Sequence, residues 1–182
     1  GHIHMPCLNN ERNPRIGFSG CIQGRDIKET GPRGCYCVTL KEGAANSVEF
    51  IPLASVVWQK LQVSLNDCVT LAQAQDAINA ALFAANGSAH CEEMVARVML
   101  TGRSPLHRIL VQPGVIEDLR QGVNEACPAF FVDTIINRTT APIDRAALKQ
   151  EGLFEATLLS KNKTLSKDTD ATVAYLQDAF LD

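Results

Sequence analysis

The chain has 182 residues, of which 46% are hydrophobic and 20% charged, and its formal net charge is −3. This composition is typical of a soluble globular chain of one or two domains that is long enough to close a core. No apolar run approaches the roughly 18 to 20 residues of a membrane span, and the start lacks the charged-then-apolar plan of a signal peptide. The seven cysteines favour reduced core thiols over disulfides or a zinc site.

The first four residues, Gly1-His2-Ile3-His4, place two histidines at positions i and i+2. In an extended segment His2 and His4 point to one side, where two imidazoles could serve one or two metal ions. A metal site needs at least three or four ligands, so we expect the chain to be the rear portion of a larger metalloenzyme. The alternative is a vector remnant, because His-Met commonly precedes a start methionine, here Met5.

Two strands are predicted next, over residues 15–21 and 34–40, with a polar loop over residues 23–33 between them. The polar stretch 41–47, which contains Gly43, is the expected domain boundary.

The following hundred or so residues predict a small α/β domain, because strand and helix patterns alternate. In chain order we expect a half-buried strand 56–65, a helix from the capping box Thr70–Gln73 to a stop at Asn86–Gly87, a strand 94–101, a short helix after Pro113–Gly114, and a strand 130–136. The helices are expected on one face of the sheet.

The end of the chain has a different pattern. Residues 142–150 look helical, residues 160–167 are polar, and residues 170–181 carry Val173, Leu176 and Phe180 on a single stripe. Such a stripe either packs on its own protein or docks a partner, and both interpretations stay open.

Three stretches resemble one protein family. They are Gly1-His2-Ile3-His4, the run Asn13-Pro-Arg-Ile-Gly-Phe-Ser-Gly, and the run Gln23-Gly-Arg-Asp-Ile-Lys-Glu-Thr-Gly-Pro-Arg-Gly-Cys-Tyr. Together they resemble the calcineurin-like metallophosphoesterases of the SbcD type, and more specifically the bacterial YhaO-like DNA repair exonucleases. Residues 100–107 are similar to the start of a loop in the family's capping domain. The resemblance covers roughly residues 1–150, and residues 23–34 are its most specific part.

The resemblance implies a two-metal phosphoesterase, usually with manganese, whose ions lie about 3.5–4 Å apart and hold a hydroxide that attacks phosphorus. In the family, G-H-x-H gives one histidine to each metal, which makes His2 and His4 metal ligands and, in that sense, catalytic residues. The family's other motifs, D-x-H, G-D, G-N-H-E and a further histidine, do not occur in this chain. Two ligands cannot hold such a site, so we expect these residues alone to be inactive. Met5 and Cys21 also replace the family's usual residues.

Charge suggests where DNA would bind. Residues 1–41 carry a net charge of +3 and the remainder −6, which suits a phosphate-bearing substrate or, alternatively, a solvated loop. Arg25, Lys28 and Arg33 are candidates for DNA phosphates; alternatively they pair with the acidic residues Asp26 and Glu29 and organise the loop.

A second pair of DNA-binding candidates is Arg103 and His107, at an expected groove-facing loop after strand 94–101. The alternative is a surface arginine and a histidine packed on Leu106.

The resemblance thus predicts an α/β (α+β) fold in three parts: the last strands of a metallophosphoesterase domain (1–46), a βαβαβ capping domain that recognises DNA ends (47–140) and a helical tail that docks a partner (141–182). The implied function is metal-dependent hydrolysis of phosphodiesters at DNA ends. The alternatives are a non-enzymatic DNA- or partner-binding module and a phosphoesterase for nucleotides or small phosphoesters. The implied cofactor is a pair of Mn²⁺ ions. The expected partners are DNA, an SMC-like ABC ATPase and a second copy through the catalytic domain, in the cytoplasm and without a membrane.

Overall fold

The computed structural model describes residues 2–9, 16–42, 44–89 and 93–143, together with residues 157, 161–162 and 172–173. The chain divides into two compact units, Gly1–Ala141 and Pro142–Asp182. The helices expected over residues 142–150 and 170–181 lie almost entirely outside the described residues. No described helix is long and apolar enough to cross a membrane.

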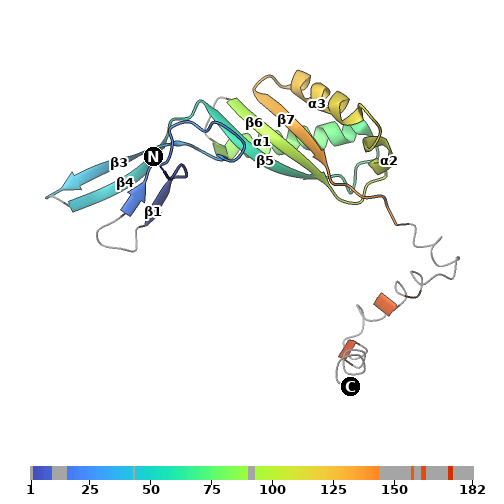
Figure 1. The fold of residues 1–182 in the computed structure, drawn as a ribbon, viewed down its shortest axis with the longest axis horizontal. Coiled ribbons are helices and arrows are strands. Elements are labelled where there is room, and N and C mark those ends of the chain that lie inside the picture. Colours follow the sequence, from blue (N-terminus) through green and yellow to red (C-terminus); the bar gives the residue numbers. More distant parts are fainter. Residues whose placement is uncertain are drawn as a thin grey trace. The chain divides into compact units, whose positions relative to one another are not determined.

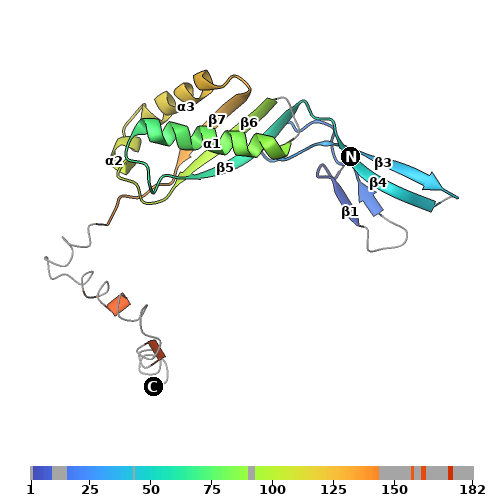
Figure 2. The same cartoon turned by 180° about the vertical axis from the view of Figure 1, so that it is seen from behind.

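The larger unit contains a parallel three-stranded sheet in the order β5-β6-β7 (Figure 1). Its elements in chain order are β5 (Val56–Ser64), α1 (Leu71–Ala89), β6 (Glu93–Thr101), α2 (His107–Leu110), α3 (Val115–Ala126) and β7 (Phe130–Asn137). Figure 2 shows α1 and α3 on the same face of this sheet. The predicted βαβαβ order, with helices on one face, is therefore confirmed.

One face of the sheet is buried because apolar residues alternate along the strands. Along β6, Met94, Ala96, Val98 and Leu100 are buried against the helices. The opposite face is more exposed. The core on the helix side includes Val63, Leu65, Ala74, Ile78, Leu82, Leu119, Val123, Phe130, Val132 and Ile135.

The open face of the sheet carries both charged and apolar side chains. Met99 is 39% exposed and Phe131 is 53% exposed. Arg97 pairs with Asp133, and its Nη2 atom lies 2.6 Å from Oδ2. This ion pair lowers the pKa of Asp133, because the guanidinium donates hydrogen bonds to the carboxylate.

Helix α1 begins where the sequence predicts and ends later. The amide of Gln73 donates to Oγ1 of Thr70 at 3.2 Å, and Oε1 of Gln73 accepts from the amides of Val69 and Thr70, which confirms the capping box. The stop expected at Asn86–Gly87 is wrong, because the helix continues to Ala89. A glycine inside a helix costs about 1 kcal/mol, which packing of the helix against the sheet can offset.

Within the described residues 2–9, 16–42 and 44–52, four further strands precede the parallel sheet. β1 (Cys7–Asn9) pairs antiparallel with β2 (Ile16–Phe18), and β3 (Gly34–Lys41) pairs antiparallel with β4 (Ala44–Pro52). The strand expected over residues 34–40 is confirmed, whereas that over residues 15–21 is shorter than predicted. Strand β4 was not predicted. A domain division between residues 46 and 47 would cut the paired β3–β4 hairpin.

Candidate metal-ligand segment and its supporting loop

The backbone of His4 is held by the chain that follows β2. The amide of Cys21 donates to the carbonyl oxygen of His4 at 3.0 Å. Gly20 adopts a φ of +77°, and a Cβ at this position would lie 2.5 Å from that same oxygen. A glycine is therefore needed at residue 20, both for its left-handed backbone and for this close approach.

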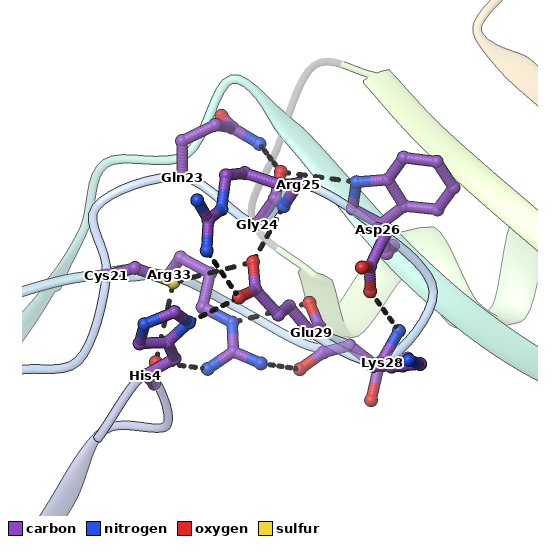
Figure 3. A network of polar contacts seen from close by, with 11 residues as sticks. His4, Cys21, Gln23, Gly24, Arg25, Asp26, Lys28, Glu29 and Arg33 are labelled. Atoms are coloured by element: carbon purple, nitrogen blue, oxygen red, sulfur yellow. Dashed lines mark hydrogen bonds and ion pairs between the residues drawn. The ribbon is translucent and has the colours of Figure 1, made fainter. Parts of the chain in front are cut away.

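Arg33 is buried within the loop and donates a second hydrogen bond to the same carbonyl (Figure 3). It is 2% exposed, and its guanidinium donates to the carbonyl oxygens of His4 at 2.7 Å, Thr30 at 2.8 Å and Glu29 at 3.4 Å. A guanidinium satisfied in this way by backbone oxygens organises the loop. Arg33 thus organises the loop through backbone oxygens rather than through the carboxylates of Asp26 and Glu29, and its burial leaves no exposed surface for a DNA phosphate.

Glu29 connects the His4 ring to the loop (Figure 3). Nδ1 of His4 lies 2.5 Å from Oε1 of Glu29, and the amide of Arg25 donates to Oε2 at 2.8 Å. These donors, that of His4 above all, lower the pKa of Glu29 to about 2. The contact of Glu29 with His4 was not predicted; Glu29 was expected only as a partner for the loop's basic residues.

The remaining loop cations are exposed. The guanidinium of Arg25 lies 3.5 Å from Oε1 of Glu29, and its side chain is 72% exposed. The amide of Lys28 donates to Oδ1 of Asp26 at 2.7 Å, and the side chain of Lys28 is exposed. Arg25 thus pairs with one loop carboxylate and still offers its charge to solvent.

The loop is attached to the edge strand of the parallel sheet. Thr30 forms a parallel bridge with Trp58 of β5, and the amide of Gly31 donates to the carbonyl of Trp58 at 2.9 Å. Nε1 of Trp58 donates back to the carbonyl of Gly24 at 3.2 Å, and Nε2 of Gln23 donates to the carbonyl of Val56 at 2.7 Å. Trp58 therefore lies at the junction of loop and sheet, and the loop that holds His4 continues the hydrogen bonding of the sheet.

His2 is exposed and lines a surface hollow of about 620 Å³ together with Ile3 and residues 17–20. His4 has a side chain that is 40% exposed. Imidazole nitrogens suit divalent ions such as manganese and zinc. Among the described residues no group of three or more His, Cys, Asp or Glu side chains could hold a metal ion. The residues that could contribute to such a site are His2 and His4.

The second pair of predicted DNA-binding residues lies at the opposite end of the parallel sheet. The hydrogen bonds of the loop reach the start of β5, whereas Arg103 and His107 follow the carboxyl end of β6. β5 has 9 residues, so the two ends of the sheet lie about 26 Å apart at roughly 3.3 Å per residue. The predicted DNA-binding residues therefore form two separate groups.

At the carboxyl ends of the strands, Arg103 forms a parallel bridge with Thr140, and its amide donates to Oδ1 of Asn66 at 2.8 Å. Nδ1 of His107 lies 3.1 Å from Oγ1 of Thr139, which is buried. His107 is therefore partly buried, with its ring hydrogen-bonded to Thr139.

Arg138 is an additional exposed cation at the carboxyl ends of the strands, where its amide donates to the carbonyl of Leu100 at 2.8 Å. Asp67, in the turn after β5, is also exposed there. The signal for Arg138 was available in the sequence, because it lies two residues after the strand predicted over residues 130–136.

Replacing Arg33 by methionine should loosen the His4 segment. The substitution keeps an apolar stem but removes the guanidinium from the carbonyls of Thr30 and Glu29, and it leaves the Cys21 amide as the remaining donor to the carbonyl of His4. Each buried carbonyl that loses its donor costs about 1–3 kcal/mol. We expect hydrogen exchange at the Cys21 amide to accelerate at least tenfold, while the Leu65 amide, bonded to Thr101 in the parallel sheet, is unchanged. Lys28→Met is the matched control, and equal exchange at Cys21 in both variants would contradict the role of Arg33.

Residues 58–140, from β5 to just beyond β7, match the family described as the metallophosphoesterase YhaO, middle domain. The chain is also similar to the uncharacterized metallophosphoesterase YhaO of Bacillus subtilis (strain 168), with 26% identity over 127 residues, 69% of this chain and 30% of that protein. The chain therefore spans less than a third of this relative's length. Both findings support a metallophosphoesterase family, a class of hydrolases that uses divalent metal ions.

Proposed function

We propose, from the metallophosphoesterase family that the comparisons support, that this chain is the rear portion of a DNA repair nuclease of the SbcD/YhaO type. In the intact protein His2 and His4 each bind one of two Mn²⁺ ions, and the enzyme hydrolyses phosphodiesters at DNA ends. The observation that best supports this proposal is how His4 is held. Arg33 donates to its backbone oxygen and Glu29 contacts its ring Nδ1, although the side chain of His4 is 40% exposed. A core histidine would be buried, and an incidental surface histidine would have no such support.

The donor chemistry fits the proposed ions. Two imidazoles on one short segment, beside a surface hollow, provide part of a ligand set for Mn²⁺. When bound, the ions supply an activated hydroxide and stabilise the attacking and leaving oxygens of the phosphodiester. The remaining ligands come from the part of the intact protein that the D-x-H, G-D and G-N-H-E motifs would occupy. The present 182 residues alone are predicted to be inactive.

DNA is the proposed substrate because exposed cations lie at both ends of the parallel sheet. Arg25 and Lys28 belong to the loop at the start of β5, and Arg103 and Arg138 lie beyond its other end. Phosphates of one DNA strand follow one another at about 3.4 Å along the helix axis, so groups about 26 Å apart match roughly eight nucleotides. Binding of an extended polyanion explains this arrangement better than binding of a nucleotide.

The proposed partners come from the resemblance. We place contact with an SMC-like ABC ATPase in residues 141–182, and a homodimer contact in the catalytic domain. Cytoplasmic location and the capping role of residues 47–140 belong to the same proposal.

A substrate comparison in the intact protein tests the DNA assignment. The double substitution Arg103→Gln and Arg138→Gln should lower kcat/KM for duplex ends by about 10- to 100-fold at physiological salt, and should reduce the salt slope by about 2. Hydrolysis of a small phosphodiester with Mn²⁺ should be unchanged, because the substitutions leave the metal-ligand segment intact.

Lys60→Gln, which removes an exposed charge from the open face of β5, is the control. If kcat/KM falls equally on both substrates, or does not fall on DNA, the carboxyl ends of the strands are not part of the DNA site. Hydrolysis of small phosphodiesters without any duplex cleavage would favour a small-molecule phosphoesterase. DNA binding without hydrolysis of either substrate would favour a non-enzymatic binding module.

A further inference from the structure

The imidazole of His4 is held at one of its two nitrogens by a carboxylate (Figure 3). Its Nδ1 lies 2.5 Å from Oε1 of Glu29, whose side chain is 12% exposed. An ionised carboxylate only accepts hydrogen bonds, so Nδ1 carries the hydrogen of this pair. In a neutral imidazole the other nitrogen, Nε2, then keeps its lone pair, which is what a histidine offers to a metal ion.

Glu29 is itself fixed by the loop. Its Oε2 accepts from the amide of Arg25 at 2.8 Å, and the thiol of Cys21 lies 4.0 Å from the same oxygen. The amide of Glu29 donates to the carbonyl of Asp26 at 3.0 Å, and the next residue, Thr30, bridges to β5. The carboxylate is therefore held in place by the backbone of the loop and by the edge of the sheet, not by His4 alone.

The backbone of His4 is held independently of its ring. Its carbonyl oxygen accepts from the Cys21 amide at 3.0 Å and from the buried Arg33 at 2.7 Å. Restraints on both the backbone and Nδ1 limit the rotation of the side chain. By contrast, the ring of His2 makes no hydrogen bond to another described residue. Without any bound ligand, the ring of His4 is thus restrained by hydrogen bonds, whereas that of His2 is not restrained by another described residue.

We propose that Glu29 is a positioning residue that keeps His4 protonated on Nδ1 and leaves Nε2 free for a divalent cation. This inference rests on the proposed function, in which His4 is a metal ligand. Carboxylates that accept the second N–H of a metal-binding histidine fix its tautomer and orientation and raise its basicity. Their loss typically costs 10- to 100-fold in metal affinity.

The tautomer can be measured without any metal. Long-range ¹H–¹⁵N NMR on the ¹⁵N-labelled 182-residue chain identifies which ring nitrogen of the neutral imidazole carries the hydrogen. We expect His4 protonated on Nδ1, and Glu29→Leu should remove this preference. Asp26→Asn, which removes a carboxylate from the same loop, should leave it unchanged. Protonation of wild-type His4 on Nε2, or an unchanged tautomer in Glu29→Leu, would overturn the inference.

Mn²⁺ binding by the intact protein, which supplies the ligands that these 182 residues lack, distinguishes this inference from the proposed function. The dissociation constant for Mn²⁺ should be about 10- to 100-fold higher in Glu29→Leu than in the wild type. Equal dissociation constants would overturn the role of Glu29 while leaving His4 as a ligand. Mn²⁺ binding that His4→Asn leaves unchanged would instead overturn the proposed function.

Discussion

Substituting His4 with asparagine in the intact protein is expected to lower Mn²⁺-dependent phosphodiester hydrolysis by about a thousandfold or more. A bound metal ion contributes several kcal/mol of transition-state stabilisation, and each 1.4 kcal/mol, approximately, corresponds to a factor of ten in rate. Asparagine keeps a polar side chain of similar reach but offers no imidazole nitrogen. The loss should appear on both duplex ends and small phosphodiesters, because the metal site serves every substrate.

Metal content provides a second readout for this prediction. If each histidine of the motif serves one ion, His4→Asn should reduce tightly bound Mn²⁺ from about two equivalents to about one. His90→Asn makes the same chemical change outside the motif and is the control. Full metal occupancy together with activity within tenfold of the wild type would exclude His4 as a ligand, and with it the assignment of the motif.

The parallel sheet could be predicted because its signals are local. Along β6 buried and exposed residues alternate, and α1 has a capping box and apolar residues at helical spacing. Each signal lies within about 20 residues of sequence, so no knowledge of distant contacts is needed. Strands β1 and β4 escaped prediction for the opposite reason: short or exposed strands are defined by pairing with a partner rather than by their own pattern.

The support of the candidate site depends on contacts between distant residues. Glu29 and His4 are 25 positions apart, and Arg33 and His4 are 29 apart. A run of loop cations is usually exposed, yet Arg33 is buried because folding brings several carbonyl oxygens around one guanidinium. The sequence could therefore predict the metal-ligand candidates through the resemblance, but it could not predict which loop residues hold them.

Leu100→Ala should lower the free energy of unfolding of the chain by about 3 kcal/mol, within the 2–5 kcal/mol usual for buried leucines. Leu100 is fully buried between the sheet and its helices, and truncation leaves a cavity in close-packed surroundings. Urea unfolding followed by far-UV circular dichroism measures the change. If the slope of the free energy of unfolding against urea concentration is unchanged, the substitution alters stability and not the surface that unfolding exposes.

Met99→Ala is the matched control, because Met99 is adjacent on β6 but faces the opposite side and is 39% exposed. Its truncation should cost less than about 1 kcal/mol, since part of the side chain already contacts water. A difference of about 2 kcal/mol between neighbouring residues would show that the chain's stability comes from the helix-covered face. If Met99→Ala and Leu100→Ala lower the free energy of unfolding equally, the open face is also covered in solution. That result would contradict a sheet packed on one side only.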